Sequence, residues 1–230
     1  MMSRTTWAAI AAITCFCAAP ICAQKETGKR LNESMEVLEA VMRVKENAIP
    51  QGLLDKAECV VIVPGVKEGA FIFGGKYGRG FLVCRKRGGV GWGGPGGVRV
   101  EGGSFGLQIG GSETDVIMLV MNRKGVEKLL KSRFTLGADA SVAAGPVGRT
   151  VSAETDALMR AEILTWSRSR GVFAGVSLQG ATLRQDLDVN KDLYGQEISN
   201  ADIVAKGLAA PASASTLISL LNRYSSRKSS

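Results

Sequence analysis

Two basic clusters and one pair of cysteines are the side chains whose types and spacing suggest chemistry. One basic cluster falls at an expected hairpin tip, and the other lies at the head of an expected helix. The candidate residues are Lys25, Lys29, Arg30, Arg85, Lys86 and Arg87. Grouped cations that face solvent attract anionic surfaces such as lipid headgroups and envelope polymers. Both clusters are therefore candidate contacts to an anionic phospholipid or another envelope polyanion. The alternative is that they only keep the chain soluble.

Cys59 and Cys84 are the cysteines that follow the first 23 residues, and each lies in a run of β-forming residues. In an exported protein two such cysteines can pair, because extracytoplasmic compartments are oxidising. The same positions also suit two small buried hydrophobic side chains. The sequence leaves both interpretations open, since a disulfide requires the two residues to lie opposite each other on one face of a sheet.

The composition argues against the common catalytic sites. The chain has no histidine, which excludes Ser-His-Asp and Cys-His catalysis as well as histidine zinc sites. Two cysteines are too few for an all-cysteine metal site. A Ser-Lys site or a carboxylate pair stays formally open, but no helical spacing pairs the aspartates Asp115, Asp139, Asp156 and Asp188. We therefore expect a non-catalytic chain without a cofactor or metal.

The segment Gly91-Trp-Gly-Gly-Pro-Gly96 has the spacing of a dinucleotide-binding motif in the wrong context. It is followed by Gly97 and an alternating strand pattern rather than by a helix, and Pro95 lies inside it. A P-loop around Gly75-Lys76 also fails, because residue 70 is Ala and residue 77 is Tyr. No nucleotide site is predicted.

The first 23 residues have the features of a secretory signal peptide. Arg4 supplies the positive charge, Trp7 to Ala19 the apolar stretch, and Ile21-Cys-Ala23 the cleavage site. An N-terminal membrane anchor is the less favoured alternative, because the apolar stretch is short for a bilayer. Cleavage would leave 28 basic and 21 acidic residues. We expect an exported, periplasmic or envelope-associated protein with peripheral membrane contact and no nucleic-acid partner.

Glu26 to Ala48 is predicted to form an amphipathic helix, which Pro50 ends. Its apolar stripe consists of Leu31, Met35, Leu38, Met42 and Ile49, with Val41 beside it. Such a stripe most often packs in a core. The basic residues at its head make a membrane-facing helix the alternative. A further short turn of helix is expected through Leu53-Leu54.

Glycine concentrates between Gly65 and Gly111, with short apolar or aromatic runs between glycine pairs. This pattern is typical of closely spaced hairpins. From Val98 to Ile109, apolar residues alternate with polar residues or glycine, which predicts one buried and one exposed sheet face. Glycines inside these strands, such as Gly80 and Gly106, indicate bulges, bends or close backbone approach.

Shorter patterns predict the remaining elements. Cys59–Val63 and Val116–Met121 are near-continuous apolar runs and should be strands buried on both faces. Asn122 is a predicted N-cap of a short helix. We also expect a strand from Phe134 to Val142, a hairpin of Glu162–Arg168 with Val172–Gln179, a polar turn region from Asp186 to Gly195, a linker from Leu208 to Ala214, and a helix from Ser215 to Tyr224.

Several motifs occur along the chain in a recognisable order. They are Ala57-Glu-Cys-Val-Val-Ile-Val-Pro64, Gly74-Gly-Lys-Tyr-Gly-Arg-Gly80, Gly110-Gly-Ser-Glu-Thr-Asp115, Val120-Met-Asn122, Leu136-Gly-Ala-Asp-Ala-Ser141, Gly145-Pro-Val-Gly-Arg149, Ser167-Arg-Ser-Arg-Gly-Val-Phe-Ala-Gly175 and Tyr194-Gly195. In this order they resemble the SYLF domain family in its bacterial secreted form, from roughly Glu33 to Gly195. Trp166 and the segment Trp92-Gly-Gly-Pro95 depart from the family pattern without breaking the fold assignment.

The resemblance implies a lipid-binding protein of a family with no established enzymatic activity. Eukaryotic members bind phosphoinositides, partly through an N-terminal amphipathic helix and basic residues, and some fungal members also bind actin. An exported bacterial chain meets neither actin nor, normally, phosphoinositides. For this chain the resemblance therefore implies an envelope phospholipid or a host lipid.

These observations predict a single α+β domain. Its body is a mainly antiparallel, glycine-rich curved sheet or barrel, packed by an N-terminal amphipathic helix and short C-terminal helices. We expect a signal peptide at residues 1–23, a SYLF-like domain at 24–207, and a linker with a C-terminal helix at 208–230. The expected function is lipid binding at anionic membrane or envelope surfaces. The alternative is an envelope structural or protein-interaction module without direct lipid contact.

Overall fold

The computed structural model describes residues 19–43, 48–70, 73–105, 110–145, 161–169, 172–174, 178 and 180–225. The strands are β1 (Cys59–Ala70), β2 (Phe73–Cys84), β3 (Gly96–Phe105), β4 (Gly110–Val120), β5 (Arg133–Thr135), β6 (Val142–Ala144), β7 (Ile163–Ser169), β8 (Val172–Ala174) and β9 (Thr182–Gln185). The helices are α1 (Ala19–Arg43), α2 (Gln51–Lys56), α3 (Arg123–Leu129), α5 (Leu187–Tyr194), α6 (Asn200–Lys206), the 3-10 turn η1 (Ala212–Ala214) and α7 (Ser215–Tyr224). Most of the predicted signal peptide lies outside the described residues.

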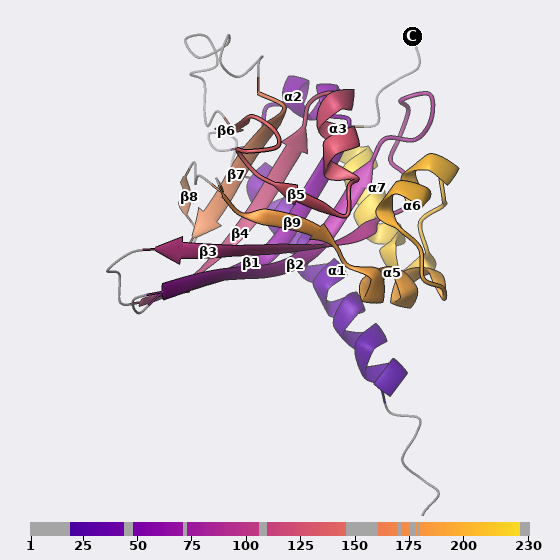
Figure 1. Ribbon diagram of the computed structural model, residues 1–230. Coiled ribbons are helices and arrows are strands. Elements are labelled where there is room, and N and C mark those ends of the chain that lie inside the picture. Colours follow the sequence, from indigo (N-terminus) through magenta and orange to yellow (C-terminus); the bar gives the residue numbers. More distant parts are fainter. Residues whose placement is uncertain are drawn as a thin grey trace, which may run out of the picture.

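The described strands form one curled sheet (Figure 1). Eight of them follow the order β5-β9-β3-β2-β1-β4-β7-β6, and β8 pairs with β7 beside this path. Neighbouring strands are antiparallel, except for β6, which runs parallel to β7. Helix α1 and the C-terminal helices complete the structure. The predicted α+β fold, with a mainly antiparallel curved sheet, an N-terminal helix and short C-terminal helices, is confirmed.

The two faces of the sheet belong to two hydrophobic cores. On β1, Val60 and Ile62 pack in the core that contains α1 and α7. The alternate residues Val61 and Val63 pack in the second core, which contains α3. All four side chains are buried. A strand covered on both faces needs apolar residues at every position, which explains the continuous apolar run predicted for this segment.

The apolar stripe of α1 is part of the first core. Leu31, Leu38 and Val41 are buried, and Met35 and Met42 are partly buried against the same cluster. The core interpretation is therefore correct, and this stripe is not available as a membrane face. The helix begins before the predicted Glu26, at Ala19. No described helix is both long enough and apolar enough to cross a bilayer.

The glycine-rich middle forms the predicted hairpins, because β1 pairs antiparallel with β2 and β2 with β3, but the strands are longer than the runs between glycine pairs. β1 and β2 have 12 residues each, and the pair Gly74-Gly75 lies inside β2 instead of at a turn. Glycine lets the backbones of β1 and β2 approach each other closely, because it has no side chain between them. A Cβ atom at Gly80 would overlap the carbonyl of Ile62, beside an irregularity of register in β1. The predicted close approach at Gly80 is confirmed, whereas Gly106 lies outside the described residues.

Two predicted elements were wrong. The single strand from Phe134 to Val142 is instead two short strands, β5 and β6, with a turn between them that includes Gly137 at φ 85°. The polar turn region from Asp186 to Gly195 is helix α5. The Asp186 side chain accepts a hydrogen bond from the Val189 amide at its start, and Gly195 ends it at φ 73°.

Other local predictions are confirmed. Asn122 caps α3 by accepting a hydrogen bond from the Gly125 amide, and α2 covers the expected turn after Pro50. β7 and β8 form the expected hairpin as far as Ala174. Helix α7 has the predicted bounds, and its Leu217 and Leu221 are buried in the same core as α1. The core therefore continues past the predicted domain division at residue 207.

Candidate functional site

Arg85 is a buried structural residue and not part of an exposed cationic cluster. It is only 7% exposed. Its guanidinium donates hydrogen bonds to the carbonyls of Leu54 (3.0 Å), Ala57 (3.2 Å) and Ser225 (2.6 Å) and lies over the ring of Trp92. It therefore joins α2 to the segment after α7. The prediction that Arg85 belongs to a lipid-facing cluster is therefore wrong. Its side chain is buried because it hydrogen-bonds carbonyls from segments that are distant in the sequence.

Lys86 and Arg87 are exposed on the loop that connects β2 to β3. The loop folds back on itself, since the Lys86 amide donates to the Gly91 carbonyl (3.2 Å) and the Gly89 amide donates to the Lys86 carbonyl (2.9 Å). Gly89 has a φ of 79°, a conformation that suits glycine. The Arg87 guanidinium also donates to the Ala205 carbonyl in α6. These contacts position the two cations at one end of the sheet.

A pocket of about 490 Å³ lies between this loop and α3, and we call it the basic pocket. Lys86, Arg87 and the exposed Arg123 line it together with buried Arg85, against the acidic residues Glu58 and Glu127. No ion pair among the described residues includes Lys86, Arg87 or Arg123. We call these three the basic rim. Cations without a carboxylate partner leave their charge available to an external anion.

Arg123 is the rim residue that sequence reasoning missed. It begins α3, directly after the predicted N-cap Asn122. Lys128 on the same helix forms an ion pair of 2.9 Å with Glu162, which fixes α3 against the start of β7. Burial acts to raise the pKa of Glu162, but hydrogen bonds from Lys128 and from the Ser141 amide outweigh it and lower that pKa. Arg123 can be recognised as a rim residue only from the structure, which places the start of α3 beside the β2–β3 loop.

Cys59 and Cys84 form a disulfide at the base of the basic pocket. They lie opposite each other in the register of β1 and β2, with their Cα atoms 4.0 Å apart. Both side chains are buried. The bond ties the two strands together immediately before the loop that carries Lys86 and Arg87. The disulfide therefore holds one side of the pocket in place beside its cationic rim.

The N-terminal basic group lies elsewhere. Lys29 and Arg30 line a different groove of about 440 Å³, between α1 and the sheet, and each has an acidic neighbour one turn away on the helix. The Lys29–Glu33 and Arg30–Glu26 distances are 3.6 and 4.0 Å. Lys25 is exposed nearby. The structure thus does not bring this group together with Lys86 and Arg87, and its charge is largely compensated.

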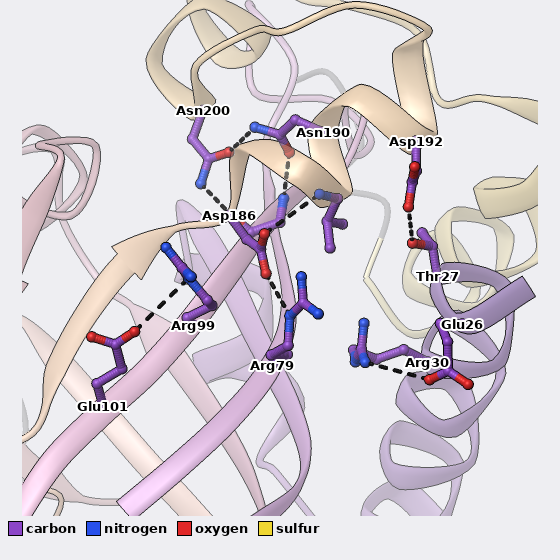
Figure 2. A network of polar contacts seen from close by, with 12 residues as sticks. Glu26, Thr27, Arg30, Arg79, Arg99, Glu101, Asp186, Asn190, Asp192 and Asn200 are labelled. Atoms are coloured by element: carbon purple, nitrogen blue, oxygen red, sulfur yellow. Dashed lines mark hydrogen bonds and ion pairs between the residues drawn. The ribbon is translucent and has the colours of Figure 1, made fainter. Parts of the chain in front are cut away.

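The motif that resembles a nucleotide-binding loop and the Gly97 that follows it, residues 91–97, form a surface on which the C-terminal helices pack, and we call this segment the glycine strip. The Gly97 amide donates to the side chain of Asn190 (2.7 Å), and its carbonyl accepts from the side chain of Asn200 (2.9 Å). Asn190 also donates to Asn200 (2.8 Å), and Figure 2 shows the two asparagines above β3. A Cβ atom at Gly97 would lie 2.7 Å from that of Val189. The absence of side chains at these glycines therefore leaves room for α5 and α6 to pack closely, and it does not serve a phosphate.

The described residues contain no group of three or more cysteine, aspartate or glutamate side chains placed to hold a metal ion. The partly buried phenol of Tyr194 donates a 2.8 Å hydrogen bond to the Pro95 carbonyl. Burial raises its pKa above the ordinary value. A phenol that is held neutral in this way acts as a structural donor. The basic pocket is thus the strongest candidate site.

Comparison with known proteins shows the family. Residues 101–224 match the family described as "Ysc84: Las17-binding protein actin regulator". This chain belongs to the Ysc84 (SYLF) family. The match includes Arg123 and the C-terminal helices but starts after β2, so Lys86 and Arg87 lie outside it. The family resemblance inferred from the motifs is confirmed, whereas the secreted lipid-binding subtype is not tested by it.

Relatives in the Ysc84 family are longer proteins. An SH3 domain-containing protein of Schizosaccharomyces pombe is 34% identical over 180 residues, which cover 77% of this chain and 41% of that protein. The human SH3 domain-containing YSC84-like protein 1 is 30% identical over 204 residues, covering 88% of this chain and 58% of that protein. Protein YSC84 of Saccharomyces cerevisiae is 29% identical over 179 residues, covering 76% and 38%. The chain spans roughly half the length of the curated relatives it matches, and two of these relatives are named as proteins that contain an SH3 domain.

Proposed function

We propose that this chain is a non-catalytic module that binds anionic phospholipid at a membrane or envelope surface through the basic rim. The observation that carries the proposal is the grouping of Lys86, Arg87 and Arg123 around one pocket, where no described residue forms an ion pair with them. A cation near an anionic bilayer surface contributes about 1 kcal/mol to binding. Three such cations account for weak, reversible and salt-sensitive attachment, as expected for a peripheral protein.

The test is flotation of the protein without residues 1–23 with vesicles of phosphatidylglycerol and phosphatidylcholine. Replacing Lys86, Arg87 and Arg123 by Ala should weaken binding on the order of a hundredfold, since about 3 kcal/mol of attraction is lost. Added salt should have a similar effect on the unchanged protein, because it screens exposed charges. A Lys25→Ala/Lys29→Ala variant is the matched control and should bind normally. Unchanged binding by the triple variant would refute the proposal.

We also propose that the chain is exported and acts at the cell envelope after cleavage behind Ala23. The support is the sequence of the first 23 residues, together with a disulfide that suits an oxidising compartment. Intact-mass measurement of the protein from the periplasmic fraction of its host tests this proposal. A mature chain that begins at Gln24 is the expected result. A full-length chain confined to the cytoplasm would contradict it.

The second candidate function is a protein-interaction or envelope-structural role. It is favoured by the family description, which denotes an actin regulator that binds Las17, and by relatives named as proteins that contain SH3 domains. In that case the rim would be solvated, and vesicle binding would be absent at any salt concentration. The flotation experiment therefore distinguishes the two candidates directly.

A further inference from the structure

Four arginines lie in register across four neighbouring strands. Arg79 on β2 is opposite Arg99 on β3, Arg99 is opposite Arg184 on β9, and Arg184 is opposite Arg133 on β5. Residues that are directly opposite in antiparallel strands project from the same face of the sheet. The four side chains therefore form one continuous row, which we call the arginine row. None of them lines the basic pocket.

This arrangement is unfavourable by itself. Neighbouring strands are only about 4.8 Å apart, and like charges directly opposite each other destabilise a sheet. Acidic residues reduce the repulsion. Asp186 holds Arg79 at 2.6 Å, and Glu101 lies 3.9 Å from Arg99 and 3.6 Å from Arg184. Asp188 also attracts Arg79 electrostatically. Three carboxylates against four guanidiniums leave an excess of positive charge in the row.

Arg99 has a buried donor that its neighbours do not satisfy. Its Nε atom is buried and makes no hydrogen bond within the described residues. Figure 2 shows Arg99 and Arg79 below α5, with Asp186 reaching down to Arg79 and Glu101 to the side of Arg99. A buried donor without an acceptor costs free energy. The neighbours of Arg99 therefore leave its guanidinium incompletely satisfied, and its exposed part is open to a further acceptor.

The row is accessible from the edge of the sheet. The exposed fraction of the side chain rises from 28% at Arg79 to 35% at Arg99 and 43% at Arg184, and Arg133 is exposed at the edge strand. A small ligand can therefore enter from β5 and reach inward as far as Arg99. A flat bilayer cannot follow the row, because Arg79 lies next to α5 and α1.

We infer that the arginine row binds a small soluble anion that carries two or more phosphate groups. The planar guanidinium donates two parallel hydrogen bonds, a geometry that matches phosphate oxygens. Each phosphate also carries more negative charge than a carboxylate, and this charge would offset the excess of positive charge in the arginine row. An extended acidic peptide fits less well. Its carboxylates on one side recur at about 6.6 Å, twice the rise per residue, whereas the arginines recur at the strand spacing of about 4.8 Å.

The experiment is isothermal titration of the disulfide-bonded protein without residues 1–23 with sodium tripolyphosphate, in magnesium-free buffer. The Arg99→Gln/Arg184→Gln variant should lose affinity by about tenfold or more, as lost charged hydrogen bonds imply. The Arg99→Lys/Arg184→Lys variant keeps the positive charge but loses the paired donors of the guanidinium. Its affinity for tripolyphosphate should lie between that of the unchanged protein and that of the Gln variant. The matched control is Lys86→Ala/Arg123→Ala, which alters the basic rim and should bind tripolyphosphate normally. Vesicle flotation by the Gln variant should also stay normal, which separates this site from the proposed membrane contact.

Folding is checked by a second readout. The Gln substitutions remove like-charge repulsion but also remove the ion pairs of Arg99 and Arg184 with Glu101, so the melting temperature without ligand should change little. Tripolyphosphate should raise the melting temperature of the unchanged protein and not that of the variant. Three results would overturn the inference: no tripolyphosphate binding, equal affinity for orthophosphate, or stronger binding of a polyglutamate peptide. Loss of vesicle binding in the Gln variant with intact tripolyphosphate binding would assign the row to a membrane and overturn it as well.

Discussion

The guanidinium carbon of Arg85 lies 3.7 Å from the centroid of the Trp92 ring, and both side chains hydrogen-bond the carbonyl of Ser225. The aromatic ring covers one face of the cation, while carbonyls satisfy its edge. This pair therefore connects the β2–β3 loop to the C-terminal segment. A cation in such a position contributes to folding and not to ligand binding.

Arg85→Ala should accordingly lower the free energy of unfolding by about 2–4 kcal/mol, because several buried carbonyls lose their donor. Lys86→Ala, at the neighbouring exposed position, should change it by less than about 0.5 kcal/mol. Urea denaturation of the two variants measures both values. Equal stability of the two variants would show that Arg85 is not held in the core.

Leu38→Ala should destabilise the protein by about 2–5 kcal/mol, the range for large-to-small substitutions of fully buried leucine. Leu38 is 0% exposed, at the centre of the stripe that α1 packs into the first core. Glu36→Ala, on the exposed side of the same helix, is the control and should leave the urea midpoint nearly unchanged. Reduced vesicle binding by Leu38→Ala without a loss of stability would instead support a membrane-facing stripe.

Reduction of the Cys59–Cys84 bond should destabilise the fold by about 3.5 kcal/mol in the chain-entropy description. The two cysteines are 25 residues apart in the sequence. Thermal unfolding with and without a reducing agent measures the effect, and a Cys59→Ala/Cys84→Ala variant should not respond to the agent. Mass spectrometry of the non-reduced protein from the periplasm should find a mass two hydrogens lower than that of the dithiol. Two free thiols there would contradict the pairing.

Acid should weaken the contact between α3 and β7. The pKa of Glu162 lies below its ordinary value of 4.5 in the folded state, so the unfolded state binds more protons at mildly acidic pH. The stabilisation is therefore complete above about pH 4.5 and is lost as the pH falls through the folded-state pKa. Melting temperatures of the unchanged protein and of Glu162→Gln should differ most near neutral pH and converge in acid. A difference that grows in acid would contradict this assignment.

Gly97→Ala should destabilise the protein by about 1–3 kcal/mol, because its Cβ atom would be forced against Val189. Gly103 lies on the same strand, and a Cβ atom added there meets nothing within 4 Å. Gly103→Ala should therefore be neutral or stabilising by up to about 1 kcal/mol. Thermal unfolding of the two variants provides the comparison. If Gly97→Ala is as stable as Gly103→Ala, the glycine strip is not needed to admit α5.

Local signals predicted much of this fold. The stripe on α1, the cap at Asn122 and the bounds of α7 depend on residues within one or two helical turns, so they can be read from sequence. Helix α5 was missed because its polar residues Asp188, Asn190 and Asp192 outweighed its apolar ones. The signals that could have found it are the cap residue Asp186 and the terminal Gly195. Both were present in the sequence.

The functional surfaces were harder to predict because they depend on distant partners. Whether Arg85 faces solvent is decided by carbonyls of Leu54 and Ser225, far away in the sequence. The arginine row requires the register of four strands, and no spacing in the sequence indicates that Arg79 and Arg184 share a face. Lys25, Lys29, Lys86 and Arg87 were correctly predicted as exposed cations. Of these, only Lys86 and Arg87 line the basic pocket.

The sheet order also constrains how the chain matures. Strands β1 to β4 are joined by short connections, but the other edge of β3 pairs with β9, which begins at Thr182. Until that segment has been made, β3 presents unpaired amides and carbonyls along one side, and an open strand edge can recruit another chain. The acceptor of Arg85 at Ser225 arrives later still. Chains that stop before residue 182 should therefore aggregate rather than fold into a smaller domain, and a translocating chain would need protection until its last helix emerges.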